Sequence, residues 1–288
     1  MPDTLSMTQG IDGSLTTPLI GQDEISSYVG RITNGLLHVV DYPPELENTF
    51  LKITRMFNEN SGPFAIILHE GGNTTDFYAN CYNHVRMALC ATWYNLQTFE
   101  NLCRKLEEWV EEVTKTHAIH TQLQMNMSGS SQKLCFEYEH FMFHQRATVD
   151  RIAFFLSGFF SKGSVQDNIL AVRKDVVRRY AHRPDHLKKR FAAAIDSVVS
   201  RHQGFLDSIH SSGVGRGQTE RDILSHKSFI PFVNALVYVN PPGKVSIVFQ
   251  ATVDGRTIAP EDARAILHQR YNQVAEFTKD MLDTFFDA

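Results

Sequence analysis

Three side chains suited to chemistry on a phosphate ester lie within six residues of one another. Arg221, Asp222 and His226 place a permanent cation, a carboxylate and a titratable imidazole about one and a half turns apart on a helix. Histidine exchanges a proton near neutral pH, and the planar guanidinium of arginine matches two phosphate oxygens. A general base beside a phosphate clamp is the minimum needed for an RNA 2′-hydroxyl to attack its neighbouring phosphate without a metal.

The surrounding residues place this segment at the start of a short helix. Glycines precede it, Thr219 is a suitable N-cap with Asp222 three residues later, and Pro231 ends the segment. Arg221 then lies in the first helical turn, where free backbone N–H groups attract anions. The same residues also suit a capped surface helix whose Arg and His make ordinary hydrogen bonds, so this second interpretation stays open.

The Arg221–His226 segment resembles the motif of the HEPN superfamily, helical-bundle proteins whose active members are metal-independent RNases. That motif is an Arg, a polar residue directly after it, and a His a few residues further on. The resemblance implies that Arg221 contacts the scissile phosphate, that Asp222 supports it, and that His226 is the general base or acid. It also implies a homodimer, because one His per chain is few for acid–base chemistry. It implies no cofactor.

A basic cluster before this motif is a second feature that favours RNA. Within 18 positions there are eight cationic residues and only two acidic ones, Asp175 and Asp185. The eight are Arg173, Lys174, Arg178, Arg179, Arg183, Lys188, Lys189 and Arg190. Such a cluster can follow a phosphate backbone, although it also suits the solvated face of two short helices broken at Pro184. We expect nucleic-acid contacts from Arg178, Arg179, Lys188, Lys189 and Arg190.

The helix expected around residue 140 carries two further groups. Glu137, His140 and His144 share one helical face, which allows a mononuclear metal site, although a polar stripe is the simpler interpretation. Arg146 and Asp150 are spaced for an intrahelical ion pair among many phenylalanines. Such an inward polar network either fixes helix register or lines a site. If the RNA site exists, we expect His144, Arg146 and Asp150 to form its second wall.

Composition narrows the class of protein. The 288 residues carry a net charge of -4, so nucleic-acid binding must be local rather than a property of the whole surface. No apolar run approaches the roughly 20 residues of a membrane span, and the N-terminal stretch is polar rather than signal-like. Cys81, Cys90, Cys103 and Cys135 form no Cys-x-x-Cys pair and fall in apolar patterns. We therefore expect reduced thiols in a cytoplasmic protein without membrane contact.

Apolar periodicity predicts the fold. Residues 1–25 are polar and predict a flexible leader, and residues 26–288 are expected to form one helical-bundle domain. Apolar stripes at helical spacing predict four long helices. They run from Asn73 or Thr74 to about 113, over about 133–160, from about 185 to 209, and from Pro260 onward. In the third of these, Leu187 is expected to be buried. The apolar run 63–68 predicts a buried strand, and β-branched runs around 240–243 predict a hairpin at about 232–252. The fold class is mainly α, a multi-helix bundle with a small antiparallel hairpin or sheet near the C-terminal part.

The sequence thus supports three hypotheses about function. The first is a HEPN-like, metal-independent endoribonuclease that acts through Arg221 and His226 as a homodimer. The second is a non-catalytic helical module that binds a partner or nucleic acid. The third is a metal-binding bundle that uses Glu137, His140 and His144.

Overall fold

The computed structural model of the protein describes residues 44–116, 123–126, 131–160, 166–180, 182–183, 186–209, 234–240, 244–250, 252–253, 256–257 and 261–288. All of them fall within the unit Asp41–Ala288. The predicted leader, residues 1–25, and the predicted domain start at residue 26 lie outside the described residues. The segment that carries Arg221, Asp222 and His226 also lies outside them.

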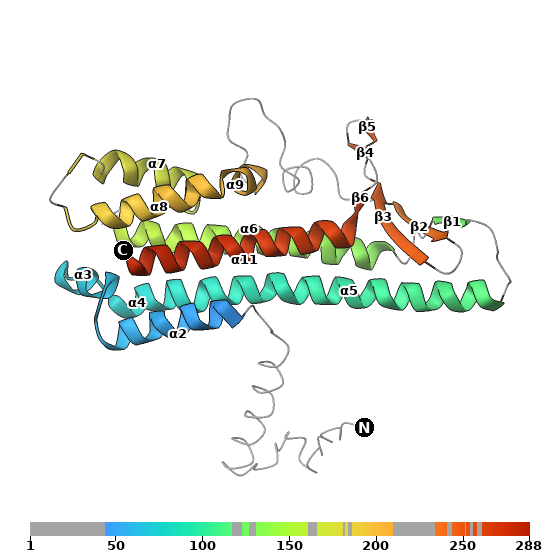
Figure 1. Ribbon diagram of the computed structural model, residues 1–288, viewed down its shortest axis with the longest axis horizontal. Helices are drawn as coiled ribbons and strands as arrows, with labels where there is room; N and C mark the ends of the chain where they lie inside the picture. The colour runs from blue at the N-terminus through green and yellow to red at the C-terminus, as the bar shows by residue number, and fades with distance from the viewer. Residues whose placement is uncertain are drawn as a thin grey trace, which may run out of the picture. The chain divides into compact units, whose positions relative to one another are not determined.

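Three long helices form the centre of the fold and confirm the mainly helical prediction. They are α5 (Val85–Thr116), α6 (Ser131–Phe160) and α11 (Ala263–Asp287). Each packs against the other two, and Figure 1 shows them side by side. The buried stripe predicted for α5, which includes Leu89, Leu96, Phe99 and Cys103, faces this core.

A short helical run leads into α5 and begins where the sequence predicted. It consists of α4 (Thr74–Tyr78) and the π-helical turn η1 (Ala79–His84). The side-chain oxygen of Asn73 accepts hydrogen bonds from the backbone N–H groups of Thr75 (3.0 Å) and Asp76 (3.1 Å). Because the first N–H groups of a helix have no partner within the helix, this cap fixes the start of the run.

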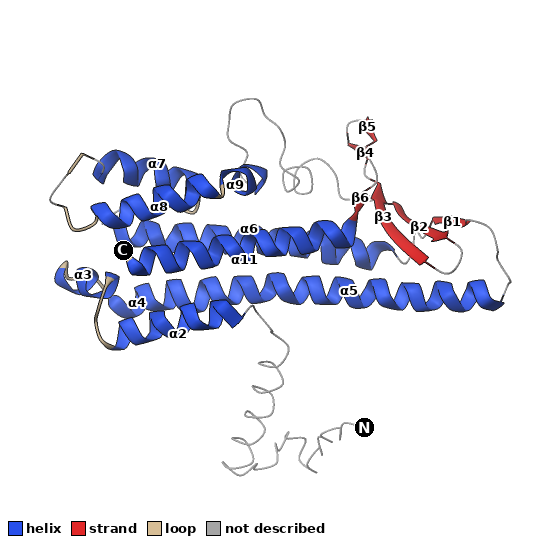
Figure 2. Ribbon diagram, viewed as in Figure 1, coloured by secondary structure: helices blue, strands red, loops and turns tan. Residues whose placement is uncertain are grey.

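Shorter helices cover the central three. Helices α7 (Ile169–Tyr180), α8 (Lys189–Arg201) and α9 (Gln203–Ile209) follow α6 in the chain. Helix α7 packs on α6 and on α8, and α8 also packs on α11, so α7 and α8 form a second layer (Figure 2). Helix α2 (Pro44–Asn58) packs on α11 and buries Leu46, Phe50 and Ile53.

The strand predicted at residues 63–68 is wrong, because these residues form helix α3 (Pro63–His69). An apolar run of six residues is too short to distinguish a strand from a buried helical turn by its period. The flanking residues decide the matter: Gly62 adopts a left-handed φ of 56°, and Pro63 occupies the first turn, where its missing N–H is harmless. Within α3, Phe64, Ile66 and Ile67 are buried and Leu68 is exposed.

Two helix starts also differ from prediction. The helix expected from about residue 185 begins at Lys189 and is interrupted at His202, between α8 and α9. Leu187, expected in the core, is 63% exposed because it precedes the first turn of α8. The terminal helix begins at Ala263 rather than Pro260, since Glu261 and Asp262 form strand β6.

A four-stranded antiparallel sheet lies in the order β1-β2-β3-β6. Strands β2 (Asn234–Asn240) and β3 (Lys244–Gln250) pair from Asn234 opposite Gln250 to Asn240 opposite Lys244. Strand β1 (Leu123–Asn126), between α5 and α6, pairs with β2, and β6 (Glu261–Asp262) pairs with β3. A separate pair consists of β4 (Thr252–Val253) and β5 (Arg256–Thr257).

Three of the four cysteines are described, and no disulfide joins any two of these three. Cys81 and Cys103 are buried and Cys90 is half-buried. Burial raises the pKa of Cys81, which keeps this thiol protonated and unreactive. Reduced cysteines stay a prediction, and the side chain of Cys135 lies outside the described residues. No helix in the described part of the chain has a stretch long and apolar enough to span a membrane.

A cluster of aromatic rings surrounds the buried Phe159, near the C-terminal end of α6. Its ring lies 5.0–5.9 Å from the rings of Phe77, Phe191 and Phe285. These three partners belong to α4, α8 and α11, so one side chain joins four helices. Most of the ring pairs meet edge to face or tilted, the arrangements that aromatic rings prefer.

We predict that Phe159→Ala lowers the free energy of unfolding by about 3–5 kcal/mol, because it removes a fully packed ring and leaves a cavity. The matched control is Phe143→Ala on the same helix, where the ring is 40% exposed, and its effect should stay within about 1 kcal/mol. Urea unfolding monitored by circular dichroism measures both. Equal losses for the two variants would contradict the central role of Phe159.

Candidate nucleic-acid interface

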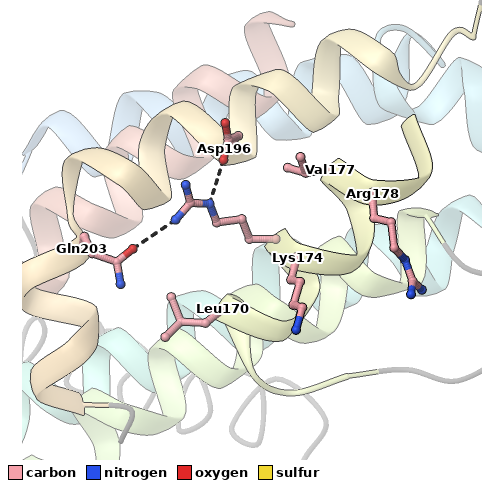
Figure 3. A pocket seen from close by; sticks show the side chains of 7 residues that line it. Leu170, Lys174, Val177, Arg178, Asp196 and Gln203 are labelled. Carbon is pink, nitrogen blue, oxygen red and sulfur yellow. Dashed lines mark hydrogen bonds and ion pairs between the residues drawn. The ribbon is translucent and has the colours of Figure 1, made fainter. Parts of the chain in front are cut away.

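The basic cluster of residues 173–190 is the predicted feature that the structure describes most fully. Four of its cations lie on α7, and Lys189 and Arg190 begin α8. Between the two helices lies a surface hollow of about 470 Å³, which we call the α7–α8 hollow. It is lined by Leu170, Arg173, Lys174, Val177, Arg178, Asp196 and Gln203 (Figure 3).

Arg173 holds the two helices together rather than offering its charge to solvent. Its Nε donates to Asp196 Oδ1 (2.7 Å), its Nη1 to Gln203 Oε1 (3.0 Å) and its Nη2 to Ser200 Oγ (2.7 Å). These bonds connect α7 with Asp196 and Ser200 of α8 and with Gln203 of α9. Because all three guanidinium nitrogens are hydrogen-bonded within the protein, the role of Arg173 is to hold the walls of the hollow in place.

Lys174 and Arg178 supply the accessible positive charge at the hollow. They are four residues apart on α7, so they lie on one face of the helix, and both are exposed. Arg178 Nη2 contacts Asp175 Oδ1 at 2.9 Å, and Arg179 Nη2 contacts Asp175 Oδ2 at 2.8 Å. The side chain of Arg178 is nevertheless 77% exposed, so this pair is weak and its guanidinium remains reachable by an anion.

Lys188, predicted to bind nucleic acid, is instead a buried structural residue. Its Nζ donates to Glu70 Oε2 (2.7 Å) and to the carbonyl oxygen of Phe159 (2.6 Å). The ammonium also lies 4.8 Å from the centre of the Phe159 ring. Its neighbours Lys189 and Arg190 are exposed, with Arg190 lying over the ring of Phe191. The predicted set therefore loses Lys188 and keeps Arg178, Arg179, Lys189 and Arg190 at the surface.

Arg146 and Asp150, predicted as part of a second wall, form the expected ion pair within α6. Arg146 Nε donates to Asp150 Oδ1 at 2.7 Å, and Arg146 Nη1 donates to the carbonyl oxygen of Ile209 at 2.8 Å. Ile209 ends α9, directly before the segment that carries Arg221 and His226. Arg146 thus fixes the point from which that segment continues.

His144 belongs to a different polar group between α5 and α6. Its Nδ1 lies 2.7 Å from Asn95 Oδ1, and Asn95 Nδ2 donates to Glu137 Oε2 at 2.9 Å. Burial lowers the pKa of His144, opposed by the carbonyl of His140 one turn earlier. Sequence reasoning missed Asn95, because its partners are more than forty residues away.

The predicted three-ligand metal site does not form. Glu137 is held by Asn95, and among the residues described no three His, Cys, Asp or Glu side chains gather closely enough to hold a metal ion.

A second surface hollow, of about 520 Å³, lies where α8 and α9 meet α11. Asp280 Oδ2 on α11 accepts from Arg201 Nη1 (2.6 Å) and lies 2.9 Å from His202 Nε2. The carboxylate offsets the charge on Arg201, so this hollow is a weaker candidate for an anion than the α7–α8 hollow. Its contacts brace the interruption between α8 and α9 against the core.

We predict that Lys188→Ala lowers the free energy of unfolding by about 1–3 kcal/mol, since it leaves the Phe159 carbonyl and Glu70 without their donor. Lys189→Ala, the adjacent exposed lysine, should change stability by less than about 0.5 kcal/mol. Thermal and urea unfolding of the two variants distinguish the buried lysine from its neighbour. A Lys188→Ala protein as stable as wild type would mean that Lys188 is available at the surface.

No protein-family model matches this sequence, and no curated protein and no solved structure matches it either. The resemblance of the Arg221–His226 segment to the HEPN motif therefore stays a prediction.

Proposed function

We propose that this chain is an RNA-binding protein in which the exposed cations of α7 and α8 contact the phosphate backbone. The observation that carries the proposal is local charge. Helices α7 and α8 together hold seven Lys and Arg residues and only two carboxylates, Asp175 and Asp196. The whole chain, by contrast, has a net charge of -4. A polyanion is attracted to such a local excess even on an acidic protein.

The positions of these cations support a backbone contact rather than a site for one small anion. Lys174 and Arg178 stand one turn apart on α7, and Lys189 and Arg190 begin α8. The α7–α8 hollow has Leu170 and Val177 among its lining residues. Apolar side chains between cations suit a flexible strand that brings bases as well as phosphates to the surface.

Cleavage of the bound RNA is the catalytic form of the proposal, and it depends on Arg221 and His226. The segment that carries them follows α9 in the chain. Helix α9 packs on α8, which carries part of the basic cluster. His226 would accept the proton of the RNA 2′-hydroxyl as this oxygen attacks phosphorus, and Arg221 would bind the phosphate oxygens. The products would be a cyclic phosphate and a free 5′-hydroxyl.

Two further properties belong to the catalytic form. One His per chain supplies either the base or the acid, so we expect a homodimer in which two motifs meet. We also expect a reducing compartment such as the cytoplasm, because the four cysteines fall in apolar patterns and form no Cys-x-x-Cys pair.

We predict that replacing Lys174, Arg178 and Lys189 by Ala weakens binding to single-stranded RNA and flattens its salt dependence. Each lost phosphate contact should reduce the slope of log K against log salt concentration by about 0.7. The matched control replaces the exposed Arg104, Lys105 and Lys133, which removes the same charge from α5 and α6. Fluorescence anisotropy over a salt series measures both. Equal effects of the two triple variants would show that net charge, and not this surface, attracts RNA.

Cleavage is tested separately from binding. His226→Ala should abolish cleavage while changing stability by less than about 1 kcal/mol and leaving RNA affinity in place. Arg221→Lys should be severely impaired, because an ammonium lacks the two-pronged contact with phosphate. Chelators should have no effect, and His182→Ala, at an exposed histidine of the basic region, should cleave as wild type does. Purified dimer that binds RNA but cleaves none above the His226→Ala background would leave the non-catalytic module as the function.

A further inference from the structure

We propose that His140 and His144 of α6 form a two-histidine site for a borderline divalent cation such as Zn²⁺ or Cu²⁺. The site is independent of the proposed RNA surface. It also differs from the three-ligand site predicted from sequence, because Glu137 supports a ligand rather than binding the ion.

The hydrogen bonds fix which nitrogen of His144 carries its proton. Asn95 Nδ2 donates to Glu137 Oε2, so the amide oxygen of Asn95 is the atom that faces His144. An amide oxygen only accepts hydrogen bonds, and Nδ1 of His144 lies 2.7 Å from it. Nδ1 must therefore be the protonated nitrogen. In neutral His144, Nε2 then carries the lone pair that binds a metal.

The surroundings of His144 match the usual support of a metal-binding histidine. Such a ligand commonly donates its second ring N–H to an acceptor that is itself held in place. Here Asn95 is that acceptor, 5% exposed, and Glu137 fixes its amide.

His140 supplies the second nitrogen. It precedes His144 by four residues within the continuous helix α6, so both imidazoles lie on one face, one turn apart. His140 is exposed and His144 is half-buried, which gives an ion access from solvent. Histidines at this spacing are a known way to place two nitrogen ligands on a helix. Imidazole suits Cu²⁺ and Zn²⁺, with Cu²⁺ the tighter of the two, and water would complete the coordination.

The experiment is a titration of the purified full-length protein with ZnCl₂ and with CuCl₂ by isothermal calorimetry. We expect one equivalent to be lost or weakened at least about tenfold in His140→Ala and in His144→Ala, since each removes one of two ligands. Asn95→Ala should weaken the same equivalent by about 10- to 100-fold, as loss of a supporting residue does. Long-range ¹H–¹⁵N NMR should report the Nδ1–H tautomer of His144 before metal is added, and a shift of its Nε2 signal afterwards.

The control is His182→Ala. His182 and His186 have the same sequence spacing as His140 and His144, but they lie between α7 and α8, outside both helices. This variant should bind metal as wild type does. His140→Ala removes only an exposed side chain, so it remains informative even if His144→Ala unfolds. Wild-type protein that binds neither ion, or binding that is unchanged in both His140→Ala and His144→Ala, overturns the proposal.

Discussion

The ring of Phe159 and the ammonium of Lys188 form the contact on which the two helical layers depend. Phe159 packs against rings from α4, α8 and α11, while its carbonyl, near the end of α6, accepts a hydrogen bond from Lys188. Lys188 directly precedes α8, and Glu70 follows α3, so one buried cation connects three parts of the chain. Burying an ammonium is costly unless it is paired, and here a carboxylate, a carbonyl and an aromatic face share the charge.

This contact also explains how the basic cluster is divided. Lys188 and Arg173 turn toward protein partners and hold α7 and α8 against each other and against the core. The exposed cations Lys174, Arg178, Lys189 and Arg190 stand on or beside the helices that these contacts hold in place. A surface whose positive groups are held by rigid helices loses less conformational freedom when it binds a polyanion than a basic loop would. The contacts that hold this layer together therefore also fix the positions of its exposed positive charges.

A second polar arrangement sets the register between α5 and α6. Thr92 and Thr148 are both fully buried and their hydroxyl oxygens lie 3.4 Å apart. The hydrogen-bonded group of Glu137, Asn95 and His144 lies next to this pair, since Asn95 is three residues from Thr92 and His144 four residues from Thr148. Each threonine hydroxyl also donates to a carbonyl of its own helix, so the cost of sliding one helix by a turn falls on buried Asn95, which would lose Glu137 and His144. Register and the orientation of His144 therefore come from the same contacts.

The sequence by itself determined the features that depend on local order along the chain. The long apolar stripes of α5 and α6 and the Arg146–Asp150 pair follow from spacings of three and four residues, and both were predicted, as was a helix start at Asn73 or Thr74. Only the tertiary structure decided the helical state of residues 63–68, the burial of Lys188 and the role of Asn95. Six apolar residues have too short a period to separate a strand from a helix, and a lysine in a basic run suits either water or a carboxylate of the protein. For Lys188 and Asn95 the choice depends on residues far away in sequence, which no local pattern contains.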